Sequence, residues 1–312
     1  TGALGQIGTE LTERLAEKYG RDRLILVDIK DCAPEGFAYY RLDVLDAHSV
    51  YKIIKENCVE VIFHMVAILS ASAEKNPHRA YEVNVTSLIN ILEIGRSLRK
   101  CLIFWPSSIA VFGPSTPREN TPQSTVMEPT TIYGITKLIG ERLCEYYYLK
   151  WGVDIRSIRY PGILSYRADP GGGTTDYAIE MIKHAVEGKN YECYIGEDVV
   201  LPMMYMEDAI NATMKIIEAP SEKVLIRSSY NIHGFSFSPS QLFTELKKYY
   251  PHFRVIYRPD ERDRIARSWP ASIDDSKARE HWQWEVSYNF ENTVRALING
   301  FKSGLHVNTT KK

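Results

Sequence analysis

The first half of the chain alternates short apolar runs with segments that have the spacing of an amphipathic helix. The apolar runs lie at 23–29, 59–65 and 101–106, with a weaker example at 37–43. Because these runs are continuous rather than alternating, they are typical of parallel strands buried on both faces. Apolar residues recur at helical spacing after Gly8, after the N-cap residue Asp46, and over about 83–99. This order of elements predicts an α/β fold with a doubly wound parallel sheet, the Rossmann architecture.

The pattern changes after another strand-like run at 153–162. The later elements are a glycine run at 171–173, helices at 176–188 and near 207–218, and a strand near 228–234. We expect this last strand to return to the main sheet. Residues 1–165 are therefore predicted to form a dinucleotide-binding Rossmann domain, and 166–312 mainly a smaller substrate-binding lobe. Open α/β sheets bind ligands at the carboxyl ends of their strands, so the site is expected between sheet and lobe.

Composition excludes several classes of function. The 312 residues carry a net charge of −1, with acids and bases interspersed, so no nucleic-acid partner is expected. The longest apolar stretch, Val59 to Ala73, contains Glu60 and His64 and is too short to span a membrane. The five cysteines form no CxxC pair and the histidines show no metal-ligand spacing, so we expect free thiols and no metal site.

The chain begins without Met. A strand is expected before Thr1, as a central strand of the sheet, and without it the sheet is predicted to have a gap. Whether a targeting segment has been removed stays open, so the compartment is expected to be the mitochondrial matrix or the cytoplasm.

The opening stretch TGALGQIG places glycines at positions 2, 5 and 8, directly before a helix. Glycines at this spacing allow a tight turn and let backbone N–H groups approach a pyrophosphate, which the helix N-terminus attracts. Asp28 ends the next strand, twenty positions after Gly8. A carboxylate there binds a ribose diol and repels a 2′-phosphate, which favours NAD over NADP. The alternative is a glycine turn that binds nothing.

Tyr133 and Lys137 are four residues apart on a predicted helix and so share one face. A nearby ammonium stabilises a phenolate, so the pKa of Tyr133 is predicted to fall below its usual value of about 10, which suits proton exchange with a substrate hydroxyl. Ser107 and Ser108 follow the strand at 101–106, where a hydroxyl can orient the substrate oxygen. Alone, either feature has an ordinary explanation: a surface Tyr–Lys pair, or serines in a turn.

Together these motifs resemble the extended short-chain dehydrogenase/reductase superfamily over essentially the whole chain. The resemblance implies that Ser108, Tyr133 and Lys137 are the catalytic residues, and that Asn84 has a structural role. It also implies that Lys137 holds the nicotinamide ribose.

The same resemblance identifies the cofactor contacts. Asp43 and Val44 in RLDV are expected near adenine, and Ile163 in RYPGI near the nicotinamide. The cofactor-binding residues expected for NAD are Gly2, Gly5, Gln6, Ile7, Gly8, Asp28, Asp43, Val44, Tyr133, Lys137 and Ile163.

Two branches of the superfamily compete. Nucleotide-sugar epimerases carry an Arg-Asp pair in the second lobe, where this chain has Leu201 and Pro202, and an apolar residue cannot bind a diphosphate. Segments 170–178, 201–206, 236–242 and 268–279 resemble instead the branch that oxidises L-threonine. That resemblance implies NAD-dependent oxidation of L-threonine at C3 to 2-amino-3-oxobutanoate. The alternatives are an epimerase or dehydratase of nucleotide sugars and a catalytically silent NAD-binding sensor.

The substrate hydroxyl is expected between Ser108 and Tyr133. For the amino-acid head group the candidates are Ser70, Gly172 and Thr175, with ordinary loop residues as the alternative. The glycine run either hinges a closing loop or forms a flexible connection.

The helices at 84–99 and 131–150 have more apolar positions than a single packing face needs. Paired across a two-fold axis they would form a four-helix interface, as is common in the superfamily. A homodimer is therefore expected.

Overall fold

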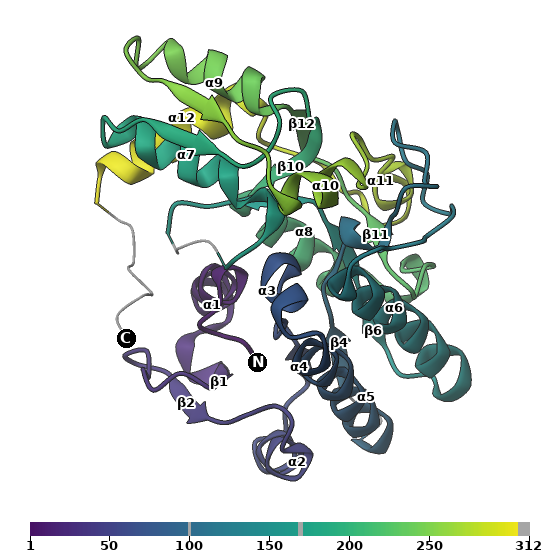
Figure 1. The fold of residues 1–312 in the computed structure, drawn as a ribbon. Coiled ribbons are helices and arrows are strands. Elements are labelled where there is room, and N and C mark those ends of the chain that lie inside the picture. Colours follow the sequence, from purple (N-terminus) through teal and green to yellow (C-terminus); the bar gives the residue numbers. More distant parts are fainter. Residues whose placement is uncertain (99–100, 168–170, 305–312) are drawn as a thin grey trace.

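Short parallel strands form the main sheet in the computed structural model, which describes residues 1–98, 101–167 and 171–304 (Figure 1). The strands are β3 (Val61–Phe63), β4 (Leu102–Phe104), β5 (Ser107–Ser108), β6 (Ile155–Arg156), β7 (Ile158–Tyr160) and β11 (Tyr230–Asn231). β4 lies between β3 and β6, and β7 lies between β5 and β11. Because β5 follows β4 and β7 follows β6, the two groups form one sheet. All its pairs are parallel, which confirms the predicted α/β fold.

The first two residues connect this sheet to another strand pair. β1 (Ile25–Asp28) and β2 (Ala38–Arg41) are parallel to each other. The Gly2 N–H donates to the Val27 carbonyl of β1 at 2.9 Å, and the Thr1 nitrogen donates to the Phe63 carbonyl of β3 at 2.8 Å. Thr1 and Gly2 therefore lie between β1 and β3, where a central strand was expected, and they position the start of the glycine turn.

Helices pack against these strands. They are α1 (Gln6–Tyr19), α2 (Ala47–Glu56), α3 (Ser70–Lys75), α4 (Pro77–Tyr81), α5 (Ser87–Leu98), α6 (Ile132–Trp151) and α8 (Met206–Glu218). α4, α5 and α6 lie side by side, and α8 packs against α1 (Figure 1). Asp46 caps α2 as predicted, its carboxylate accepting the Ser49 N–H at 3.1 Å. None of the helices within the described ranges is long and apolar enough to cross a membrane.

The helix predicted over 83–99 contains a wider turn. A π-helical segment, Glu82–Thr86, connects α4 to α5, and Arg99 lies outside the described residues. Within this segment, Asn84 Oδ1 accepts the Ile68 N–H at 2.8 Å and its Nδ2 donates to Thr136 Oγ1 at 3.1 Å. The π turn thus ties the loop after β3 to α6, and π turns often occur beside functional sites.

The later part of the chain builds a lobe at the top of Figure 1. Its strands are β8 (Gly162–Leu164), β9 (Tyr191–Cys193), β10 (Leu201–Tyr205), β12 (Phe235–Phe237) and β13 (Val255–Tyr257). The helices of the lobe are α7 (Tyr177–Val186), α9 (Pro239–Lys247), α10 (Glu261–Arg267) and α12 (Phe290–Lys302), whereas α11 (Ser276–Trp282) packs against β11 of the main sheet. β10 lies between β8 and the antiparallel β12, and β9 pairs with β13. Short 3₁₀ turns cover Arg21–Arg23, Ile109–Val111, Thr174–Asp176 and Ser221–Lys223.

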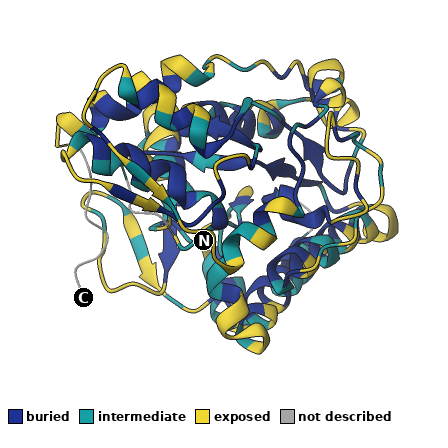
Figure 2. Ribbon diagram, turned by 45° about the horizontal axis from the view of Figure 1, so that its top comes forward, coloured by how far each residue is buried: buried dark blue, intermediate teal, exposed yellow. Residues whose placement is uncertain are grey.

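Two loops that are far apart in the sequence pair beside the lobe. The Ala271 N–H donates to the Arg118 carbonyl at 2.8 Å, and the Thr121 N–H donates to the Ser272 carbonyl at 2.9 Å. This pairing holds the segment that carries the buried Trp269. Figure 2 shows buried strands at the centre of the molecule and exposed residues on the outer faces of the helices.

Candidate active site

One pocket lies where the main sheet meets the lobe. Its walls come from the ends of β5 and β7, from α6 and from the 3₁₀ turn Thr174–Asp176. The pocket brings together the sequence-predicted residues Gln6, Ile7, Ser70, Ser108, Tyr133, Lys137, Ile163 and Thr175. The predicted residues outside its lining are Gly2, Gly5, Gly8, Asp28, Asp43, Val44 and Gly172. Lining residues that sequence analysis did not name include Met65, Leu69, Tyr160, Asp176 and Trp269.

Ser108 and Tyr133 line the pocket together, and Ser108 lies close enough to favour the ionised form of the Tyr133 hydroxyl. The Ser108 oxygen also accepts the Ala110 N–H at 3.2 Å, at the start of the 3₁₀ turn that follows β5. Because a backbone amide occupies one lone pair of this oxygen, the Ser108 proton is oriented toward other acceptors. The pair can therefore hold a substrate hydroxyl between two polar groups.

Lys137 lies one helical turn after Tyr133 on α6 and is buried. Its Nζ donates to the Pro106 carbonyl at 2.6 Å, and lies 4.6 Å from the ring centroid of Trp105 and 5.6 Å from that of Tyr133. Pro106 is its one hydrogen-bond partner among the described residues. An ammonium has three N–H donors, so Lys137 can also bind a ligand oxygen.

Burial changes the protonation of this pair, and here the sequence-based prediction was wrong. The pKa of Tyr133 does not fall; burial raises it to about 12, and the Ser108 hydrogen bond offsets only part of that effect. Burial lowers the pKa of Lys137 to about 7, although the Glu141 carboxylate one turn away favours its charged form. Removing a single charge from water is costly, so burial shifts both groups toward their neutral forms.

The glycine turn has the shape of a phosphate-binding loop. Gly2 has a φ of +70°, and a Cβ on Gly8 would lie 2.1 Å from the Gly2 carbonyl oxygen. Gly5 is the N-cap of α1 and supplies no side-chain hydrogen bond, so the first N–H groups of α1 point to an anion site. Gln6 lines the pocket, and its buried Nε2 has no hydrogen-bond partner among the residues that the structure describes. These features fit the pyrophosphate of a dinucleotide.

Asp28 ends β1 beside this turn and is buried. Its Oδ2 accepts the Leu4 N–H at 2.9 Å and its Oδ1 accepts the Lys30 N–H at 3.2 Å. A carboxylate fixed next to a glycine turn is positioned for a ribose diol. In the loop after β2, Asp43 pairs with Arg79 at 3.2 Å, and Val44 is buried.

Of the residues predicted for the head group of the substrate, Ser70 and Thr175 line the pocket and Gly172 lies just outside its lining. Ser70 Oγ lies 3.0 Å from Thr174 Oγ1 and accepts the Thr174 N–H at 3.2 Å, and Thr175 follows in the same wall. Gly172 has a φ of +85° and donates its N–H to Asp176 at 2.9 Å. This part of the glycine run is therefore a hydrogen-bonded turn against Asp176.

Asp176 and Trp269 line the pocket but were not predicted from the sequence. Both lie in segments that carry the family resemblance, 170–178 and 268–279, so a signal was present. Neither segment, however, shows which of its side chains reaches the site. Trp269 reaches it because the loop at 118–121 holds the adjoining segment in place.

A buried ion pair supports this cluster from the side of the sheet. Glu141 lies one turn after Lys137 and accepts both the Nε and an Nη of Arg159 at 2.8 Å, with the two side chains 0% and 2% exposed. Ser107 Oγ donates to Glu141 at 2.6 Å, and Arg159 Nη1 donates to Asn231 Oδ1 at 3.0 Å. The ion pair thereby joins β5, α6, β7 and β11.

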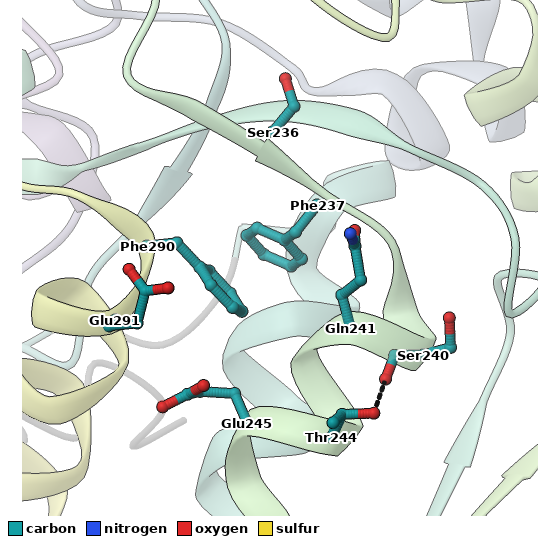
Figure 3. A pocket seen from close by; sticks show the side chains of 8 residues that line it. All are labelled: Ser236, Phe237, Ser240, Gln241, Thr244, Glu245, Phe290 and Glu291. Carbon is teal, nitrogen blue, oxygen red and sulfur yellow. Dashed lines mark hydrogen bonds between the residues drawn. The ribbon is translucent and has the colours of Figure 1, made fainter.

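A second hollow lies in the lobe, between β12, α9 and α12 (Figure 3). It is lined by Ser236, Phe237, Ser240, Gln241, Thr244, Glu245, Phe290 and Glu291. No sequence-predicted site residue belongs to this lining. Within the described part of the chain, no three His, Cys, Asp or Glu residues are grouped so that they could hold a metal ion.

A Rossmann sheet with a Ser–Tyr–Lys cluster at the ends of its strands defines the extended short-chain dehydrogenase/reductase class. The chain belongs to the NAD dependent epimerase/dehydratase family, whose model matches residues 1–232.

Relatives and solved structures resemble the chain over nearly its whole length. An uncharacterized epimerase/dehydratase of Staphylococcus haemolyticus is 43% identical over 307 residues, which cover 97% of this chain and 96% of the relative. A partial consensus L-threonine 3-dehydrogenase is 46% identical with a TM-score of 0.95, over 97% of this chain and 98% of that one. A monomeric L-threonine 3-dehydrogenase from a metagenome is 43% identical with a TM-score of 0.94, over 98% of both chains.

The buried ion pair leads to a prediction about stability. Glu141→Gln leaves the buried Arg159 without a counter-charge, so the free energy of unfolding is expected to fall by about 3 kcal/mol. Chemical denaturation measures this change. The matched control is Glu145→Gln on the same helix, because the Arg142–Glu145 pair is exposed and its loss should cost less than about 1 kcal/mol. Equal losses in the two variants would contradict the role given to the buried pair.

Proposed function

We propose that this chain catalyses the NAD-dependent oxidation of L-threonine at C3 to 2-amino-3-oxobutanoate. The observation that carries the proposal is a pocket lined by the Ser108–Tyr133–Lys137 cluster together with the hydroxyls of Ser70, Thr174 and Thr175 and the carboxylate of Asp176. The similarity to two structures described as L-threonine 3-dehydrogenases, at 43–46% identity, supports it. The bacterial origin of the Staphylococcus haemolyticus relative favours the cytoplasm over the mitochondrial matrix.

The pocket favours a small substrate over a nucleotide sugar. Among the described residues that line it, only Lys137 and Asp176 are charged, whereas a sugar diphosphate calls for several cations. Leu201 and Pro202 are buried in β10 and can offer no charge. A catalytically silent sensor is disfavoured because Ser108, Tyr133 and Lys137 all face the same pocket.

The residues around the glycine turn would hold the cofactor. The N-terminus of α1 and Gln6 would bind the pyrophosphate, Asp28 the adenosine ribose, Asp43 and Val44 the adenine, and Ile163 the nicotinamide. A bound nicotinamide would supply the acceptor for the hydride that leaves C3 of the substrate.

The proton of the substrate hydroxyl is transferred to a side chain of the protein. Ser108 holds the oxygen of the substrate hydroxyl, and Tyr133 removes its proton as the C–O bond becomes a carbonyl. Burial disfavours a lone phenolate, but a phenolate beside an ammonium is a neutral pair, so a charged Lys137 makes Tyr133 a usable base. The Pro106 carbonyl holds the Lys137 ammonium in place for this role.

A spectrophotometric assay tests the function. The protein with L-threonine and NAD⁺ is expected to produce NADH, and Tyr133→Phe is expected to lower the rate at least about a hundredfold while leaving NAD binding nearly unchanged. UDP-sugars in a parallel assay are expected to give no turnover. Turnover of a UDP-sugar without NADH formation from threonine would establish the epimerase alternative, and substantial activity of the phenylalanine variant would exclude Tyr133 as the base.

Asp28 is expected to set the preference for NAD over NADP. Asp28→Asn keeps an acceptor for the Leu4 N–H but removes the charge that repels a 2′-phosphate, so the ratio of kcat/KM values for the two cofactors should narrow about five- to tenfold. Asp43→Asn is the matched control and should leave the ratio unchanged. An unaltered ratio in the Asp28 variant would rule out this assignment.

We propose further that the chain forms a homodimer through α5 and α6. Ile135, Tyr146 and Leu149 of α6 are 41%, 51% and 75% exposed and lie along one stripe at helical spacing. Exposed apolar stripes of this kind are typical of contacts between subunits. Because one similar structure is described as monomeric, the contact needs a direct test.

Sedimentation measures the oligomeric state. The unmodified protein is expected to sediment as a dimer at micromolar concentration, and Ile135→Asp as a monomer, since a charge would be buried at the contact. Ile256→Asp is the control, because Ile256 is also exposed but lies on β13 in the lobe. A monomer in the absence of any substitution would count against the proposed dimer.

A further inference from the structure

Asp176 is a buried carboxylate in the wall of the pocket that the mechanism above does not use. It ends the 3₁₀ turn Thr174–Asp176 and is 8% exposed. Its Oδ2 accepts the N–H groups of Gly172 at 2.9 Å and Gly173 at 2.6 Å. Among the described residues, no lysine or arginine lies within ion-pairing distance of it. A carboxylate of this kind is costly to bury unless a ligand supplies the missing positive charge.

The charges around Asp176 leave this end of the pocket negative. Arg262 of α10 is the cation that favours its ionised form, but that guanidinium is already paired with Asp260 at 2.6 Å. Glu180 of α7 adds a further negative charge, with the Tyr191 hydroxyl as its partner at 2.7 Å. Tyr194 is the remaining titratable group beside it. The local field therefore attracts a cationic group.

We propose that Asp176 is the residue that binds the ammonium group of the substrate, and this inference rests on the proposed oxidation of an amino acid. The two glycine N–H groups fix one oxygen of the carboxylate, which leaves the other oxygen for a charge-assisted hydrogen bond. The hydroxyls of Ser70, Thr174 and Thr175 then remain for the substrate carboxylate. This arrangement selects amino acids that carry a 3-hydroxyl and discriminates against hydroxy acids that lack the amino group.

The proposal implies a dependence of binding on pH. Burial raises the pKa of Asp176 to about 6, although the Gly172 and Gly173 N–H groups oppose this shift. Because the raised value means that the charge is lost as the pH falls through about 6, the KM for L-threonine should rise on the acidic side of that value. The KM for a 3-hydroxy acid without an amino group should not follow this curve.

Asp176→Asn tests the charge alone, since the amide oxygen can still accept the two glycine N–H groups. The KM for L-threonine is expected to rise about tenfold or more, with a smaller change in kcat. The further rise of this KM below about pH 6 should disappear in the variant. Selectivity for L-threonine over 3-hydroxybutanoate should fall by a similar factor. The matched control is Asp208→Asn, because Asp208 is also buried and accepts two backbone N–H groups, from Ser287 at 3.0 Å and Tyr288 at 2.9 Å, but does not line the pocket.

Calorimetry of L-threonine binding to the NADH-loaded protein separates this inference from the proposed function. Turnover of L-threonine together with an unchanged KM and selectivity in Asp176→Asn would overturn the inference and leave the function standing. Binding of L-threonine that the substitution weakens, without turnover, would support the inference and overturn the function. Should the variant unfold, the unmodified protein decides, because a KM for L-threonine that stays flat between pH 5 and 7 contradicts the role of Asp176.

Discussion

The pairing of Glu141 with Arg159 is the constraint on which the geometry of the site depends. Each charge is buried, and neither is tolerable in the interior without the other. To keep them together, the structure must hold α6 against β7, and Ser107 adds β5 to the same arrangement. The residues that face the ligand are the immediate neighbours of these groups, Ser108 beside Ser107 and Lys137 one turn before Glu141. Their positions are thus set by the Glu141–Arg159 pair, neither member of which lines the pocket.

The pocket changes the protonation of its ionisable groups because burial separates them from water. Tyr133, Lys137 and Asp176 are all shifted by burial toward their neutral forms, each by the same physical cause. Such groups gain their charge when a complementary charge arrives beside them. A zwitterionic substrate and a cationic cofactor ring are ligands of this type, whereas a sugar diphosphate would find only one cation along the described walls.

Local patterns in the sequence predicted much of this architecture. The continuous apolar runs became parallel strands, although only the middle residue of β3 is fully buried and β2 is mostly exposed. Asp46 became an N-cap, and Ser108, Tyr133 and Lys137 met in one pocket, because strand ends and helix faces follow from short-range periodicity. Contacts between distant segments could not be predicted in this way. Nothing in the sequence distinguishes Glu141 and Arg159 from ordinary surface charges. Trp269 reaches the pocket only because two loops pair that are separated by about half the chain. The pKa of Tyr133 was predicted with the wrong sign because proximity can be seen in a sequence and burial cannot.

The return of β11 to the sheet has a consequence for how the chain matures on the ribosome. Asn231 completes the hydrogen bonding of Arg159 and lies 72 residues beyond it. While the lobe is still being synthesised, the edge of the sheet beside β7 stays open, with part of a charged side chain unsatisfied. Pairings of such long range form late and slowly, and an open strand edge in the interval invites contact with other nascent chains. Once β11 has been synthesised and has paired with β7, this edge of the sheet is no longer open to other chains.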